Sequence, residues 1–412
     1  MFLWRTVRQK LSPVLDLRAD SDFFALLRLH FLLSGVYLQT RRWWLRWLFR
    51  LYQLLHPVQC LIWLYRAWLV AYVEQNKTLA LSLLCGLFAI TTIVARAGLM
   101  VASYGRLEPV RRYINSQRFL PDHPVAQRLR QRAFRSSNTI LLCLMAYGAA
   151  NFVAYVALDL QSHDIFRVPD CLWRTNVPLA WTLHVLTHSM TLHGLSAFVA
   201  SFLSMHTMLT ALQAEFLLVE HAFGGLLGRA EAAAAGGTAR ELWPALNREL
   251  GSCVREHCEV IRHIREVNRV LSFAIIVQYY SALLSLAIDT FFVSYNGFDS
   301  VTMMVVLFSA LLVFEWYLCC KLIEDLQATN KRIGWTLYND RWPSWLRYGR
   351  GEHRGELRQF RIALSVVLLV SQRSLAFHGS DIIEVSWETF GQMLKTSYSV
   401  MMFLIELRKL NR

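Results

Sequence analysis

Residues 387–407 read WETFGQMLKTSYSVMMFLIEL, and this stretch decides how the rest of the chain is interpreted. It is an apolar, helix-forming run, and about 20 such residues suffice to cross a bilayer. Its centre nevertheless carries the polar residues Lys395 to Ser399. Polar groups at that depth are costly against lipid and therefore face protein or water. The stretch predicts a helix that lines a water-filled ion pore.

The composition indicates an integral membrane protein with several spans. Of the 412 residues, 55% are hydrophobic and only 17% are charged, whereas soluble proteins carry about 25% charge. No Asp, Glu, Lys or Arg occurs from Asn176 to Ala214, which is rare in a soluble core helix. The net charge of +14 comes from short basic blocks between apolar runs. This pattern is typical of cytoplasmic loops, so we expect no nucleic-acid partner.

No motif indicates catalysis, a cofactor or a metal site. The eight cysteines form no CxxC pair and no His/Cys metal spacing. A Walker motif, a nucleophile elbow and an intramembrane acid pair are all absent, so the chain is not predicted to be an enzyme. A transporter is the alternative that remains, but the sequence shows no internal repeat to support it.

The apolar runs predict an all-α fold with seven membrane-spanning helices. We expect them at 47–73, 78–102, 138–160, 177–222, 270–295, 300–320 and from Trp387 onward. The run 23–38 is too short to span and predicts an interfacial or re-entrant helix. Polar helical stretches at 245–269 and after Cys320 predict extensions beyond the membrane, and 224–244 is expected to be a flexible linker.

The distribution of positive charge predicts the orientation. Most of the 43 lysines and arginines lie in the N-terminal region up to Arg50 and in 103–137, 223–269 and 321–373. The positive-inside rule therefore places the N-terminus in the cytoplasm and the C-terminus outside. The glycosylation sequon Asn76-Lys77-Thr78 falls in a loop that this topology places outside. G-protein-coupled receptors have the opposite orientation, so we expect that no G protein is required.

Three segments of the chain resemble the insect odorant receptors. They are Phe23-Phe24 through Leu29-His30-Phe31 to Gly35; Ala328 through Leu337-Tyr338-Asn339 to Trp342-Pro343; and Arg373-Ser374 with Phe390 and Leu394-Lys395-Thr396-Ser397-Tyr398-Ser399. The last is the most specific. In the related gustatory receptors the final helix ends with the pattern Thr-Tyr, five apolar residues, Gln-Phe. At the Thr-Tyr position this chain has Ser397-Tyr398, and at the Gln-Phe position it has Leu404-Ile405, which favours an odorant receptor. A gustatory receptor stays the alternative.

The resemblance implies a ligand-gated, non-selective cation channel of four subunits, located in the plasma membrane of olfactory neuron dendrites. It divides the chain into a cytoplasmic N-terminus (1–46), six spans that hold the odorant pocket (47–320), a cytoplasmic anchor segment (321–385) and the pore-lining final helix with its extracellular tail (386–412). The final helix would carry the pore and gate residues, which are Lys395, Ser397, Tyr398, Met401, Leu404 and Ile405. In the family's shared co-receptor, the positions of Met401 and Ile405 narrow the pore, and a hydrophobic constriction of this kind closes by dewetting.

The linker between the fourth and fifth spans is short, whereas the co-receptor has a long insertion there. The chain is therefore predicted to be an odour-tuning subunit that forms a heterotetramer with the co-receptor. A receptor that works alone as a homotetramer stays open as the alternative. The permeant species would be cations, and the ligand a small volatile organic molecule.

The resemblance also implies an odorant pocket in the outer half of spans two to six. The candidate ligand-binding residues there are Leu83, Leu87, Asn151, Phe152, Tyr155, Trp181, His184, His188, Ile288, Phe291, Met304 and Phe308. Aromatic and aliphatic groups with few polar ones suit volatile ligands, which bind mainly by burial. His184 and His188 share a helical face, but no Cys or carboxylate lies near them in sequence, so hydrogen bonding or packing is expected rather than a metal.

Two residues of the final helix have competing interpretations. Lys395 lines the inner vestibule or pairs with an acidic residue such as Glu315 or Glu388, and pairing is preferred because unpaired lysines would repel cations. Tyr398 is expected to pack against neighbouring helices rather than contact ions.

Overall fold

The structure is a computed structural model that describes residues 15–18, 21–160, 168, 170–234, 239–297, 299–339, 354–380 and 382–410. Its elements are α2 (Ala25–Leu33), α3 (Trp43–Tyr72), α4 (Lys77–Tyr104), η1 (Gly105–Leu107), α5 (Glu108–Ser116), α6 (Pro124–Ala157), α7 (Asp170–Thr175), α8 (Val177–Gly224), α9 (Leu226–Ala233), α10 (Ala239–Asn296), α11 (Ser300–Asn339), α13 (Arg354–Gln372), β1 (His378–Gly379), β2 (Ile383–Glu384) and α14 (Trp387–Leu410). The all-α prediction is confirmed.

Six helices in the described part of the chain are long and apolar enough to cross a membrane. They are Trp43–Tyr72, Ser82–Ser116, Pro124–Ala157, Val177–Gly224, Leu242–Ser294 and Ser300–Asn339. The second of these runs from α4 through η1 to the end of α5, and the fifth lies within α10. α14 has 24 residues, which is long enough to cross, but it carries Glu388, Lys395 and Glu406 and is less apolar. The multi-pass fold is thus confirmed, while the crossing by α14 and the direction of the termini stay predictions.

α8 is the central helix of the bundle. It contacts α6, α11, α4 and α10, and α2 and α3 pack on it as well. The uncharged run of its sequence explains this position, because a helix that is apolar on all sides is stable only when it is surrounded. The helix expected over 177–222 is therefore present.

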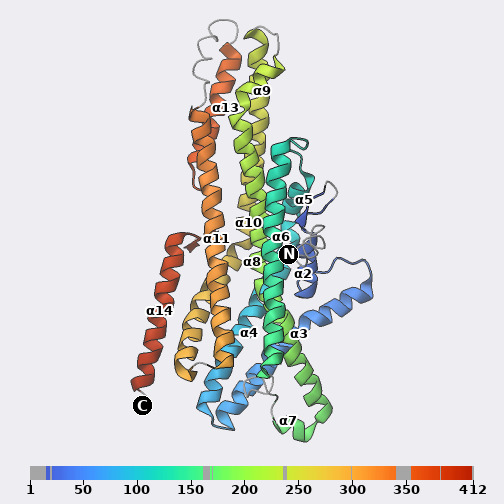
Figure 1. The fold of residues 1–412 in the computed structure, drawn as a ribbon, viewed down its shortest axis with the longest axis vertical. Helices are drawn as coiled ribbons and strands as arrows, with labels where there is room; N and C mark the ends of the chain where they lie inside the picture. Colours follow the sequence, from blue (N-terminus) through green and yellow to red (C-terminus); the bar gives the residue numbers. More distant parts are fainter. Residues whose placement is uncertain are drawn as a thin grey trace, which may run out of the picture.

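The bundle is elongated because three helices extend far past a bilayer thickness (Figure 1). α8 has 48 residues, α10 has 58 and α11 has 40, whereas about 20 suffice to cross. The extensions end beside α9 and α13, at the opposite end of the molecule from α7. The predicted extensions of spans four to six are thus present.

Two segments differ from the sequence-based expectation. The helix that contains the third expected span, 138–160, already begins at Pro124, because the arginine-rich turns before 138 are also good helix formers and continue the same helix. The supposed linker 224–244 contains α9 and the first turn of α10. Its alanine-rich composition favours helix, since alanine has the highest helix propensity.

α2 occupies the position predicted for an interfacial helix and is fixed to α8. His30 is buried, and its Nε2–H donates to the backbone oxygen of Ser196 on α8 at 3.0 Å. Burial lowers the pKa of His30 to about 4, so the ring is neutral near pH 7.

The second segment of the family resemblance, Ala328 to Pro343, is only partly described by the structure, because Trp342 and Pro343 lie outside the described residues.

A hairpin of two short strands, in which Gly379 of β1 pairs with Ile383 of β2, connects α13 to α14. The Ser272 hydroxyl on α10 donates to the carbonyl oxygen of His378, and a Cβ added at Gly379 would lie 2.8 Å from Cγ1 of Ile276. Glycine is therefore required for the hairpin to approach α10 this closely. α14 then runs beside α10 at the edge of the bundle and also contacts α11 (Figure 1).

Candidate functional site

An unbroken row of aromatic side chains lies at the α7 end of the bundle. The Tyr155 hydroxyl on α6 is 2.6 Å from Nδ1 of His188 on α8, and Nε2 of His188 is 2.9 Å from Nδ1 of His184. Trp181 packs edge-on against His184 with ring centroids 5.6 Å apart, and Trp173 of α7 packs on Trp181 at 5.7 Å. The structure thus brings together Tyr155, Trp181, His184 and His188, four of the predicted ligand residues.

Tyr155 also belongs to a separate apolar cluster at this end, which we call the α7-end cluster. Its buried members are Trp63, Ala67, Val70, Ala80, Leu83, Tyr155, Leu160, Phe292 and Val301, and Leu87 and Met304 pack against it. Five helices, α3, α4, α6, α10 and α11, contribute to this cluster. Three further predicted residues, Leu83, Leu87 and Met304, therefore belong to or pack against the same cluster as Tyr155.

The other predicted ligand residues lie elsewhere or have separate contacts. The Asn151 amide donates to the Tyr147 carbonyl of its own helix at 2.8 Å. Phe308 packs on Phe198 of α8, with centroids 5.0 Å apart, in the main core of the bundle rather than in the α7-end cluster. Phe152, Ile288 and Phe291 are half-buried. Their roles stay predictions.

Sequence reasoning missed Trp63, which is buried in the α7-end cluster. Its indole lies against Gly86 of α4, where an added Cβ would be only 2.1 Å from Cζ3 of the ring. A glycine in a spanning helix is the signal that would have found it, because small residues let neighbouring helices approach closely in membranes.

Replacing Gly86 with Leu is expected to displace Trp63 and to weaken ligand-evoked responses strongly, because no side chain fits between α3 and α4. Gly98, on the same helix with open space around its Cβ position, provides the control Gly98→Leu. Dose–response curves of both variants, with surface expression measured in parallel, test this. Equal responses from the two variants would show that the Trp63 contact has no role in the site.

Asp289 of α10 is a second residue that the sequence did not single out. Its carboxylate accepts a hydrogen bond from the Ser309 hydroxyl of α11 at 2.8 Å. Acidic groups inside a spanning segment are costly and commonly mark functional positions. This contact ties α10 to α11 near Met304, which packs against the α7-end cluster.

The predicted pore residues fall on two faces of α14. Met393, Ser397 and Met401 are buried at a spacing of four, and the Ser397 hydroxyl lies 3.0 Å from the Leu283 carbonyl oxygen of α10. Tyr398 is 62% exposed, and Lys395 is exposed too, whereas Leu404 and Ile405 are half-buried. Lining of a pore by any of these residues stays a prediction.

The suggested ion pair between Lys395 and Glu315 was wrong. Glu315 of α11 instead pairs with Arg96 of α4, whose Nη2 lies 2.7 Å from Oε2, and each side chain is only 1% exposed. The Arg96 guanidinium also lies over the Phe198 ring of α8, 3.9 Å from its centroid. The carboxylate is therefore already neutralised in the core, away from the exposed Lys395 of α14. Glu388, the other suggested partner, accepts a hydrogen bond from Gln392 at 3.3 Å.

Asn76 begins α4 as its N-cap. Its side-chain oxygen accepts a hydrogen bond from the Leu79 backbone N–H at 3.1 Å, which satisfies one of the free donors of the first turn. The residue is exposed. Glycosylation at Asn76 stays a prediction.

The family model and the solved structures that match this chain point to the same kind of protein. Residues 78–398 match the family model of the 7tm odorant receptors, and no curated protein matches. The fold is similar to that of the insect olfactory receptor OR5 from Machilis hrabei, with a TM-score of 0.72 at 12% identity. The same receptor in complex with eugenol gives a TM-score of 0.71 at 11% identity. Each comparison covers 94% of this chain and 100% of the other.

Proposed function

This chain belongs to the 7tm odorant receptor family, and we propose that it is the odour-tuning subunit of a ligand-gated, non-selective cation channel. The family match confirms the resemblance found in the sequence. In the proposed mechanism, a small volatile organic molecule binds at the α7 end of the bundle. The subunit assembles with the odorant co-receptor as a heterotetramer, and α14 contributes to a central pore.

The grouping of predicted ligand residues at the α7 end of the bundle is the observation that supports the proposed odorant site. Seven of the predicted residues, from four helices, lie in the aromatic row or in the α7-end cluster, which share Tyr155, and they combine a large apolar surface with a few hydrogen-bonding groups. Pockets for small organic molecules have this composition. The similar structure that holds eugenol supports a small organic ligand for this chain as well.

The exposed face of α14 supports assembly with other subunits. Within this chain α14 contacts α10 and α11, and the described side chains Lys395, Thr396, Tyr398 and Ser399 remain exposed. In a membrane such a polar face requires protein or water beside it. A pore shared with neighbouring subunits provides both.

We place the receptor in the plasma membrane, and in olfactory neurons we expect it in the dendrite. The basic segments near the N-terminus and at the α9 end would face the cytoplasm, and the α7 end would face the odorant outside. This arrangement is opposite to that of a G-protein-coupled receptor, so the current is expected to persist when G-protein signalling is blocked.

Whole-cell recording from cells that express this chain with the co-receptor, challenged with a broad odorant panel, tests the function. We expect rapid cation currents, and we expect Tyr155→Phe to raise the half-maximal odorant concentration about fivefold. Tyr155 holds His188 in place, and one net hydrogen bond contributes about 1 kcal/mol. Tyr65→Phe, which removes a hydroxyl from an exposed tyrosine of α3, is the control.

Currents from this chain alone would show a self-sufficient homotetramer instead of a tuning subunit. If no odorant evokes a current with or without the co-receptor, although the protein is present at the cell surface, the channel proposal is refuted. Stoichiometric uptake of a solute without ligand-evoked current would identify a transporter.

A further inference from the structure

A cavity of about 630 Å³ lies between α2, the end of α4 and α5, far from the α7 end. Its volume falls within the range of about 300–1,000 Å³ that is usual for small-ligand pockets. The described residues that line it are Asp22, Phe24, Arg28, Tyr37, Gln39, Tyr104, Gly105, Glu108, Arg111, Arg112, Asn115 and Ser116.

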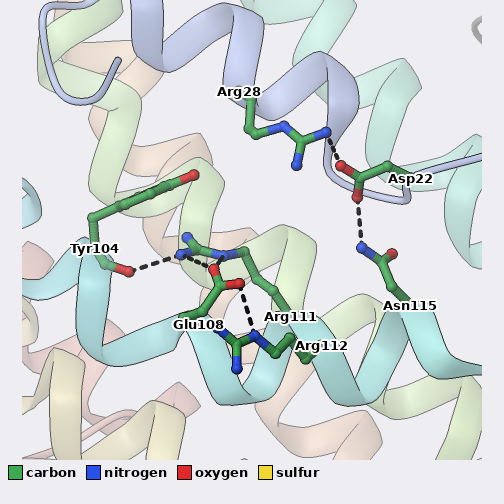
Figure 2. Close-up of polar contacts among 7 residues, drawn as sticks. All are labelled: Asp22, Arg28, Tyr104, Glu108, Arg111, Arg112 and Asn115. Atoms are coloured by element: carbon green, nitrogen blue, oxygen red, sulfur yellow. Dashed lines mark hydrogen bonds and ion pairs between the residues drawn. The ribbon is translucent and has the colours of Figure 1, made fainter. Parts of the chain in front are cut away.

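The charged side chains that line this cavity have one positive charge in excess. Three guanidinium groups face two carboxylates. Figure 2 shows Arg28 turned toward Asp22 from α2, while Glu108 alone receives both Arg111 and Arg112 from α5. The shortest of these last contacts are 2.7 Å to Arg111 and 3.1 Å to Arg112. One carboxylate cannot neutralise two guanidinium groups.

Arg111 is held rigidly in the wall. Its Nη2 donates to the Tyr104 carbonyl at 3.0 Å, and its guanidinium lies 3.8 Å from the centroid of the Tyr104 ring. That ring is itself stacked on Tyr37 at 3.9 Å. Nη1 of Arg111 has no acceptor among the described residues. Arg111 therefore supplies a fixed, incompletely neutralised charge, whereas Arg112 is 78% exposed and Arg28 is 43% exposed.

The surroundings place the cavity at the membrane–water interface. α4, an apolar spanning helix, ends at Tyr104. The exposed leucines of α2 are those expected of a helix lying in the interface; they are Leu29, Leu32 and Leu33. α3 begins with the exposed tryptophans Trp43, Trp44 and Trp47 among Arg41, Arg42, Arg46 and Arg50. Tryptophan marks the headgroup level, and clustered arginines beside a membrane attract acidic phospholipids.

We propose that this cavity binds the headgroup phosphate of an acidic phospholipid. Arg28 and Arg112 reach the phosphate oxygens by bidentate hydrogen bonds, which the planar guanidinium group favours. Arg111 adds its fixed charge from the wall, and the acyl chains lie along the exposed leucines of α2. The bound lipid would fix α2 to the end of α4.

Binding to the purified full-length chain in detergent tests this, with dioctanoyl phosphatidylinositol 4-phosphate as the probe. We expect saturable binding that Arg112→Gln weakens about fivefold or more, the amount expected for one arginine at a charged lipid surface. Arg106→Gln is the matched control, because Arg106 is exposed in the adjacent η1 helix but does not line the cavity. Arg28→Gln should weaken binding as Arg112→Gln does, with unchanged melting temperatures.

Two further probes distinguish the source of the phosphate. Dioctanoyl phosphatidylcholine should bind much more weakly, since it carries no net charge. Free inositol 1,4-bisphosphate should also bind more weakly, since it lacks acyl chains. Equal binding of phosphatidylcholine, or equal effects of Arg106→Gln and Arg112→Gln, would overturn the site. Equal affinity for free inositol 1,4-bisphosphate would overturn the lipid as its ligand. No odorant is involved, so the result is independent of the channel proposal.

Discussion

Replacing Arg96 with Met is expected to lower the melting temperature of the purified receptor by about 5–10 °C. The substitution leaves the Glu315 carboxylate, which is 1% exposed, without its cation. Breaking a buried pair from one side costs about 3–5 kcal/mol, and each kcal/mol corresponds to about 2 °C in a chain of this size. Tryptophan fluorescence during heating measures the change.

The double variant Arg96→Met with Glu315→Leu separates the charge from the packing. We expect it to recover most of the lost stability, because two apolar side chains of similar volume replace a buried pair at little cost. Its odorant response should stay reduced, since the pair connects α4 with α11 and both helices contribute to the α7-end cluster. If the double variant melts as low as Arg96→Met, the loss comes from packing and not from the unpaired carboxylate.

Asn330→Leu is expected to destabilise the connection that leads to α14. The Asn330 amide on α11 donates toward the carbonyl oxygens of Ser371 and Arg373 at the end of α13, at 3.1 and 3.2 Å. Its oxygen accepts a hydrogen bond from His257 of α10 at 3.2 Å. Leucine fills similar space but leaves these groups unpaired, and each unsatisfied buried group costs about 1–3 kcal/mol.

Thr329→Val provides the control for this substitution. Thr329 is equally buried, but among the described residues its hydroxyl bonds only within α11: it donates to the Asp325 carbonyl at 2.8 Å and accepts from the Arg332 guanidinium at 3.0 Å. We expect the fall in melting temperature to be at least twice as large for Asn330→Leu, together with a reduced maximal current. Similar falls for the two variants would mean that Asn330 does not hold α13 in place.

The long apolar helices were predictable from the sequence, whereas the start of α6 and the presence of α9 were not. α8 is buried because its uncharged run leaves no side suited to water, and α10 continues past the membrane because its polar turns still favour helix. Apolar length and helix propensity are local properties, so they can be read without knowing the neighbours. The specific motif around Tyr398 identified the family for the same reason, since it is contiguous in sequence.

The candidate ligand site was predicted only in part. His184 and His188 are one helical turn apart, so their shared face followed from spacing. The hydrogen bond from Tyr155 to His188 joins two helices, and Trp63 joined the cluster only because Gly86 leaves it room. Such contacts depend on the rotation of one helix against another.

The charged residues show most clearly which features follow from the sequence and which depend on the tertiary structure. The sequence alone determined that the chain crosses a membrane several times and places basic residues in blocks. It did not determine that Arg96 meets Glu315, 219 residues away, or that Asn330 caps α13. Only the tertiary structure decided these pairs, because a buried charge or amide is stabilised by whichever group the packing brings within hydrogen-bond distance.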